Sequence, residues 1–259
     1  MKNVALITGA SSGIGKEFAH IHAEKGGDLI IVARNEAKLN ALKTELEAKY
    51  SIEVVVLVKD LTAPTAPLEI YTEVKESGIL LGYLINNAGF GGQGYFHERA
   101  WEEDLSMIQL NVISLTALTR YFLPDFVAAN KGKILNVSST AAFMPGPLQA
   151  VYYATKAYVT SFSNAIAEEL SYTNVTVTVL MPGATETEFA RISGMDKTDL
   201  FDKAASARSV AEDGYNGMIA GKLDVISGLS FSLRMLVSIS PLLPKKVLLK
   251  NIKNMQETV

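Results

Sequence analysis

The sequence contains no cysteine, which excludes disulfides, thiol catalysis, iron–sulfur clusters and most structural zinc sites. It also lacks a basic excess: 24 basic and 27 acidic side chains leave a net charge of −3, whereas nucleic-acid-binding domains are usually basic. Histidine is scarce, and His20 and His22 are spaced so that they do not share a helix face. We therefore expect no metal site and no nucleic-acid partner.

Long hydrophobic runs are absent as well. No window reaches the roughly 18 uninterrupted apolar residues of a transmembrane helix, and the apolar stretch before the first glycines is too short for a secretory signal. These features predict a cytoplasmic protein. Residues 230–254 are apolar, basic and interrupted by proline, so contact of this tail with a membrane surface stays open.

The 259 residues, 48% of them apolar, are enough for one large domain or two small ones with a substantial core. Short, nearly all-apolar runs recur along the chain, each with the length of a strand covered on both faces. The six runs are Val4–Ile7, Leu29–Val32, Val54–Val58, Leu80–Ile85, Ile134–Val137 and Val175–Leu180.

Stretches with helical spacing separate these runs. Residues 35–49 place Leu39, Leu42 and Leu46 on one face, and a second helix is expected to face inward through Leu105, Ile108, Val112, Leu115, Thr119 and Phe122. The alternation predicts an α/β fold with a Rossmann-like, doubly wound parallel sheet and helices on both faces. A seventh strand is expected at Asp224–Ser227, after a helix over Val210–Lys222. Without repeats or linkers, we predict one domain with a core over 3–228 and a short helical C-terminal extension over 229–259.

A glycine-rich turn follows the first strand, where residues 8–15 read TGASSGIG. Glycines at a strand-to-helix turn let a phosphate approach the backbone and the helix N-terminus. The spacing is G-x-x-x-G-x-G rather than the common G-x-G-x-x-G, and a glycine cluster out of context could be an ordinary loop. At the first turn of a doubly wound sheet, it favours a dinucleotide site.

Over about residues 3–228 the chain resembles the short-chain dehydrogenase/reductase family. Residues 8–15 match the family's cofactor motif, Asn86–Gly89 its second signature, and Asp60-Leu61 the pair that contacts adenine. Ser114 departs from the family, which usually has glycine there, and this puts local helix packing in question. The resemblance, together with Arg34 discussed below, implies cofactor contacts from Gly9, Ser11, Ser12, Gly13, Ile14, Gly15, Arg34, Asp60, Leu61, Asn87, Ala88, Gly89, Tyr152, Lys156, Pro182, Gly183 and Thr187.

Tyr152 and Lys156 are spaced to share a helix face. A phenol with a pKa near ~10 exchanges protons poorly at neutral pH, and a nearby ammonium lowers that pKa. An isolated Y-x-x-x-K is more often a surface pair, and Tyr153 is a neighbouring alternative. The family pattern selects Tyr152.

Ser139 and Asn111 complete the expected catalytic set. The family pattern selects Ser139 over Ser138, and implies that its hydroxyl holds the substrate oxygen. For Asn111 the resemblance implies a helix kink and a water-mediated proton relay with Lys156. A structural asparagine tying helix to strand is the alternative, and we expect both roles together.

The cofactor preference depends on the end of the second strand. NAD selectivity needs an acidic residue there, but Ala33 occupies that position and Arg34 follows. An arginine can form bidentate bonds to a 2′-phosphate, and Lys16 could add positive charge. Arg34 could instead simply face water. We predict a preference for NADP(H), with NAD(H) possible.

The implied reaction is reversible hydride transfer between the cofactor and a carbonyl or alcohol. An idle nucleotide-binding sensor or scaffold on the same fold is the alternative. Apolar residues expected around the pocket favour a small, apolar substrate; these are Phe90, Tyr95, Phe96, Phe143, Met144, Pro145 and Leu148.

The last expectations concern the tail and assembly. Residues 230–254 are expected to form a helical flap near the substrate mouth, with a surface helix or a membrane-touching tail as the alternative. The resemblance implies a homodimer or homotetramer assembled through the helices that carry Asn111 and Tyr152.

Overall fold

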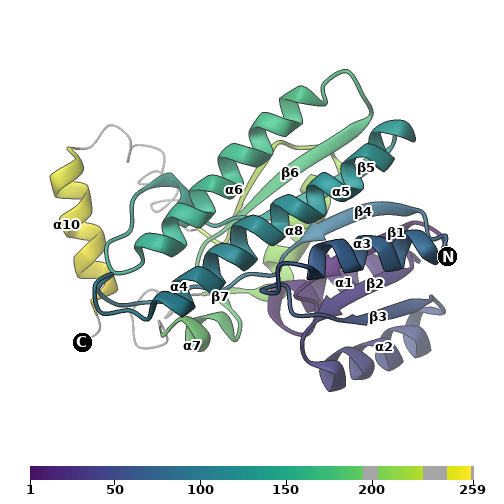
Figure 1. Ribbon diagram of the computed structural model, residues 1–259, viewed down its shortest axis with the longest axis horizontal. Helices are drawn as coiled ribbons and strands as arrows, with labels where there is room; N and C mark the ends of the chain where they lie inside the picture. The colour runs from purple at the N-terminus through teal and green to yellow at the C-terminus, as the bar shows by residue number, and fades with distance from the viewer. Residues whose placement is uncertain (195–203, 230–243, 258–259) are drawn as a thin grey trace.

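The computed structural model describes residues 1–194, 204–229 and 244–257. Seven parallel strands form one sheet in the order β3-β2-β1-β4-β5-β6-β9, which confirms the predicted doubly wound fold (Figure 1). The strands are β1 (Val4–Thr8), β2 (Leu29–Ala33), β3 (Val54–Val58), β4 (Leu81–Asn86), β5 (Gly132–Val137), β6 (Val175–Pro182) and β9 (Asp224–Ser227).

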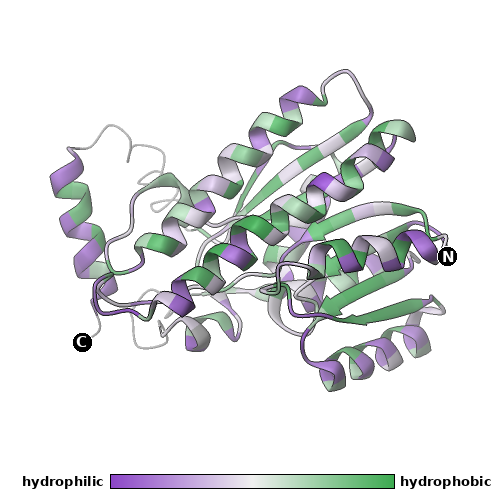
Figure 2. Ribbon diagram, in the orientation of Figure 1, coloured by the Kyte–Doolittle hydropathy of each residue, from purple (hydrophilic) through white to green (hydrophobic). Residues whose placement is uncertain are grey.

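Helices cover both faces of the sheet. Along β1, Ala5 and Ile7 belong to one apolar cluster and Val4 and Leu6 to another, because successive side chains of a strand point to opposite faces. Both faces are thus buried, which is why the strands read as continuous apolar runs rather than alternating ones (Figure 2). One face carries α1 (Gly13–Glu24), α2 (Glu36–Tyr50) and α8 (Ala207–Ile219), and the other α3 (Ala66–Glu76), α5 (Leu115–Ala128) and α6 (Ala150–Glu169).

The helical stretch before α5 corrects one sequence expectation. It consists of α4 (Trp101–Ile108) followed by a π-helical segment, Gln109–Ser114. Leu105 was expected to face inward but is 47% exposed, whereas Asp104 is buried and pairs with Arg99 at 2.8 Å. The paired carboxylate of Asp104, rather than Leu105, faces the interior, so the apolar pattern alone predicted the wrong inward face for α4.

Four further elements, two short strands and two helices, lie beyond the carboxyl ends of the strands of the sheet (Figure 1). A parallel pair, β7 (Thr185–Glu186) and β8 (Ala205–Ser206), and the short α7 (Phe189–Ser193) were not predicted. The C-terminal α10 (Lys245–Gln256) lies beyond the amino-terminal ends of α4 and α6 (Figure 1). None of the helices within the described ranges is long and apolar enough to cross a membrane.

Candidate active site

A cavity of about 640 Å³ opens at the carboxyl ends of the strands. Its wall includes these predicted residues: Gly9, Ser11, Ser12, Gly13, Ile14, Arg34, Asp60, Leu61, Asn87, Ala88, Gly89, Ser139, Tyr152, Lys156, Pro182, Gly183 and Thr187. Gly15 and Asn111 lie behind the wall. Sequence reasoning did not assign several other wall residues. Lys38, Glu188 and Phe189 come from elements with no other assigned role, whereas Leu110 and Tyr153 are chain neighbours of Asn111 and Tyr152.

The glycine turn requires its glycines. Gly9 and Gly13 have φ angles of 68° and 54°, which only glycine adopts readily. A Cβ on Gly15 would lie 2.3 Å from the carbonyl oxygen of Gly9 and 2.4 Å from Nδ2 of Asn87. Gly15 therefore allows close packing beneath the turn rather than forming the cavity wall.

The N-terminus of α1 fits an anionic group. The N-cap, Ser12, makes no side-chain capping bond, and the first turn carries no acidic residue. The first amides of a helix have no intrahelical partner, and the helix dipole adds positive potential there. Together with the glycine turn on the cavity wall, these donors fit the pyrophosphate of a dinucleotide.

Lys156 and Tyr152 are both buried on α6. The Lys156 ammonium donates to the carbonyl oxygen of Val137 at 2.9 Å and lies 5.8 Å from the centre of the Tyr152 ring. Burial lowers the pKa of Lys156 to about 8, because a charged ammonium loses solvation in the interior. The pair is therefore internal, not the surface pair of the alternative interpretation.

The pKa of Tyr152 differs from the sequence expectation. Burial raises it above the ordinary phenol value, and a hydrogen bond with Ser139 opposes that rise only in part. The expected lowering by Lys156 was wrong in net direction, because the lysine ammonium is directed at the Val137 carbonyl while the phenol is fully desolvated.

The two serines after β5 point differently, as side chains near a strand end should. Ser138 donates to the Lys156 carbonyl oxygen at 2.8 Å, also bonds Thr160, and so anchors α6. Ser139 accepts from the Ala141 amide at 3.1 Å and bonds Tyr152. The serine selected by the family pattern is thus the one beside the buried phenol.

Asn111 lies in the π-helical segment, 1% exposed. Its amide pairs with both backbone groups of Phe90, accepting from the N–H at 3.2 Å and donating to the carbonyl at 2.9 Å, and it also donates to Thr155. A Cβ on Gly89 would lie 3.0 Å from Oδ1 of Asn111 and 3.4 Å from Nζ of Lys156. Asn111 and Lys156 therefore converge on the same point of the backbone.

Comparison with known proteins identifies the family. The sequence matches the short chain dehydrogenase family over residues 3–197. The chain belongs to the short-chain dehydrogenase/reductase family, a family of oxidoreductases.

Named relatives are similar over most of this chain. It is 34% identical to mouse very-long-chain 3-oxoacyl-CoA reductase over 73% of this chain and 61% of that protein. It is 35% identical to human 17-beta-hydroxysteroid dehydrogenase type 3 over 72% of this chain and 60% of that protein. The chain thus spans about three fifths of the length of these curated relatives. A short-chain dehydrogenase from Sphingobium yanoikuyae, solved with NADPH, is 31% identical, with a TM-score of 0.83 and 98% of each chain covered.

Tyr153, the neighbour that the family pattern passes over, also lies on the cavity wall. Nε2 of Gln256 in α10 donates to its hydroxyl at 2.6 Å, and Gln93 donates to the Gln256 carbonyl. Burial raises the pKa of Tyr153 to about 12. The C-terminal helix is therefore tied to the cavity through Tyr153.

The expected apolar lining is only partly present. Phe90 lines the cavity, but Tyr95 and Phe96 are 45% and 64% exposed. The apolar wall comes instead from Leu110 and Phe189. The apolar character of a loop residue therefore does not by itself predict that its side chain faces the cavity.

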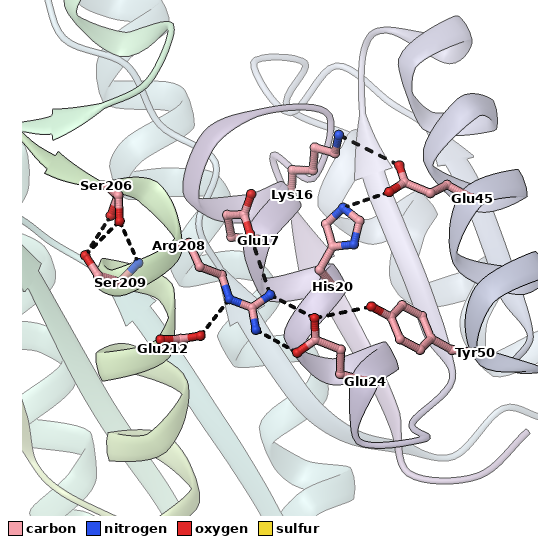
Figure 3. Close-up of polar contacts among 10 residues, drawn as sticks. All are labelled: Lys16, Glu17, His20, Glu24, Glu45, Tyr50, Ser206, Arg208, Ser209 and Glu212. Carbon is pink, nitrogen blue, oxygen red and sulfur yellow. Dashed lines mark hydrogen bonds and ion pairs between the residues drawn. The ribbon is translucent and has the colours of Figure 1, made fainter.

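Two further expectations are resolved by local contacts. Lys16 reaches away from the cavity toward Glu45 of α2, at 3.9 Å, beside the ion pairs that join α1 to α8 (Figure 3). Ser114 causes no packing defect, because its buried hydroxyl donates to the Leu61 carbonyl. The hydroxyl thus links the π-helical segment to the residue expected at the adenine.

Proposed function

We propose that this protein is an NADP(H)-dependent oxidoreductase that transfers hydride between the nicotinamide and a carbonyl or alcohol carbon. The observation that carries the proposal is the meeting of Ser139, Tyr152 and Lys156 on one cavity wall that also contains the glycine turn. Family membership supports the reaction class.

In this proposal the bound nicotinamide supplies or accepts the hydride. Ser139 and Tyr152 hold the substrate oxygen, and in the reducing direction the Tyr152 hydroxyl donates its proton to that oxygen as negative charge develops. The raised pKa of Tyr152 keeps the phenol protonated before each turnover. Lys156 holds positive charge near the phenol, and Asn111 orders the backbone where a water can return the proton.

We propose NADP(H) as the preferred cofactor. Arg34 lines the cavity, and Ala33 stands where a carboxylate would repel a 2′-phosphate. Burial raises the pKa of Asp60, but hydrogen bonds from Thr62 and the charge of Arg34 outweigh this and leave it lowered. Replacing Ala33 by Asp and Arg34 by Gln should move the preference toward NAD(H).

We propose a large apolar carbonyl compound as the substrate class, in place of the small apolar substrate predicted from the sequence. The cavity wall is apolar around Phe90, Leu110 and Phe189. The relatives named for 3-oxoacyl-CoA and hydroxysteroid chemistry support a bulky, apolar substrate.

We propose that α10 forms the outer wall of the substrate end. Leu248, Ile252 and Gln256 are buried, so the inward face of this helix packs against the protein rather than a membrane. Lys253 also lies 5.4 Å from the centre of the Tyr95 ring. The other hydrophobic tail positions, Phe231, Leu233, Leu236, Val237, Ile239, Leu242 and Leu243, lie outside the described residues.

A homodimer or homotetramer is the proposed assembly. Three apolar side chains are exposed here: Leu105 in α4 (47%), Ile113 in the π-helical segment that carries Asn111 (49%), and Tyr158 in α6, which carries Tyr152 (40%). Large exposed apolar side chains on neighbouring helices favour an interface. Light scattering that finds a monomer would contradict this assembly.

Incubating the purified protein with NADPH and a panel of bulky ketones and 3-oxoacyl thioesters tests the proposed activity. NADPH consumption should occur with the wild type and with Tyr172→Phe, a change of an exposed tyrosine just beyond the C-terminal end of α6. Tyr152→Phe should lower the rate roughly 10²–10⁴-fold and should still bind NADPH. Tight nucleotide binding without turnover of any substrate would favour the sensor alternative.

A further inference from the structure

An ion pair spans the edge of the cofactor cavity. Nζ of Lys38, in the first turn of α2, lies 2.9 Å and 3.1 Å from the two carboxylate oxygens of Glu188, between β7 and α7. Both side chains line the cavity, and both are partly exposed, at 46% and 41%. An exposed pair of this kind is weak and readily exchanged for a stronger partner.

Glu188 places negative charge beside the glycine turn. Its pKa is lowered first by the Lys38 hydrogen bond and charge, with a smaller contribution from a hydrogen bond to Ser12, so the group is anionic at neutral pH. A phosphate entering this part of the cavity would be repelled by Glu188 and attracted by Lys38. The pair therefore stands where a phosphate can replace the carboxylate.

Lys38 follows Arg34 by four residues, and both cations line the cavity. Asn35 caps α2 by accepting from the Lys38 amide at 2.9 Å, so Lys38 lies in the first turn of the helix, where the helix dipole adds positive potential. The other nearby lysines have partners elsewhere: Lys59 pairs with Glu69 and Glu73, and Lys16 is directed toward Glu45 (Figure 3).

We propose that Lys38 is a second ligand of the 2′-phosphate of NADP(H), and that the phosphate displaces Glu188 from it. This inference rests on the proposed NADP(H) dependence. NAD(H) carries no 2′-phosphate and leaves the Lys38–Glu188 pair in place. Lys38 therefore contributes to discrimination between the two cofactors, and Glu188 competes with the phosphate for it.

Calorimetric titration of the full-length protein with NADPH and with NADH tests the assignment without requiring turnover. Lys38→Ala should weaken NADPH binding by about tenfold or more, the size of one charge-assisted hydrogen bond, and change NADH binding by less than about twofold. Lys38→Arg should restore NADPH binding. Glu188→Gln should tighten NADPH binding, because the competing carboxylate is gone.

Lys49→Ala is the matched control, since it removes the same charge from the exposed far end of α2. It should leave both affinities unchanged, and melting curves should be the same for all variants. Unchanged NADPH binding in Lys38→Ala would overturn the assignment, as would equal losses for both nucleotides. Failure of the wild type to bind NADPH would contradict the proposed function itself.

Discussion

The ammonium of Lys156 lies 5.8 Å from the centre of the Tyr152 ring, and both side chains are almost fully buried. Burial acts on the two groups in opposite directions, lowering the pKa of Lys156 to about 8 and raising that of Tyr152. At neutral pH the phenol is protonated and the lysine is mostly cationic. Both states suit proton donation to a substrate oxygen.

These pKa values predict the pH profile of carbonyl reduction. Activity needs the Lys156 cation, so kcat/KM should be level below about pH 8 and fall as the pH rises through that value. The phenol stays protonated over the same range, so it contributes no earlier loss. Steady-state rates at saturating NADPH measure this profile. A profile that stays level to pH 10, roughly two units above the pKa of Lys156, would contradict the role of this lysine.

Asn111→Ala should lower both stability and kcat. The change leaves the two backbone groups of Phe90 without their buried partner, which costs about 1–3 kcal/mol in the free energy of unfolding. Urea denaturation and steady-state kinetics measure the two effects. Ser114→Ala, in the same π-helical segment, is the control and should lose stability with kcat preserved. If Asn111→Ala also kept its kcat, the asparagine would be purely structural.

His22 should make stability depend on pH. Nε2 lies 2.6 Å from the Asn3 carbonyl oxygen and therefore donates, while Nδ1 accepts from the Tyr215 hydroxyl at 2.8 Å. Burial lowers the pKa of His22 in the folded state, so below the ordinary value of 6.5 the unfolded chain binds more protons. Its stabilising contribution is complete above pH 6.5 and decreases as the pH falls below that value.

Urea midpoints near pH 7.5 and near pH 5.5, on either side of the ordinary histidine pKa, measure this effect. The loss on acidification should be smaller in His22→Gln than in the wild type. His97→Gln changes an exposed histidine and should behave like the wild type. Equal acid sensitivity in all three proteins would rule out a contribution from His22.

Gln256→Ala should loosen the substrate end of the cavity. Losing the bond to the Tyr153 hydroxyl should raise KM for a bulky substrate about fivefold, with little change in NADPH affinity. Asn254→Ala, at an exposed position of α10, should change neither. A KM unchanged in Gln256→Ala would show that α10 is not part of the substrate wall.

The sequence predicted the sheet well because most of its strands, such as β1, β2, β5 and β6, are apolar runs covered on both faces. The inward face of α4 was predicted incorrectly. Asp104, paired with Arg99, takes the buried side that was expected for Leu105, and a charged pair leaves no apolar pattern in the sequence. The direction in which the pKa of Tyr152 shifts was predicted incorrectly, because the burial that raises it exists only in the folded chain. Lys38 and Glu188 are 150 positions apart, and the fold brings the first turn of α2 and the β7–α7 connection together.

Deuterium transfer from NADPH carrying deuterium at nicotinamide C4 tests the central claim most directly. Mass spectrometry of the alcohol from a single turnover should find deuterium on the former carbonyl carbon, because that carbon receives the hydride. Tyr152→Phe should form this product far more slowly. An alcohol without deuterium when either C4 hydrogen position is labelled in turn, or no alcohol from any ketone or thioester tested, would contradict hydride transfer by this site.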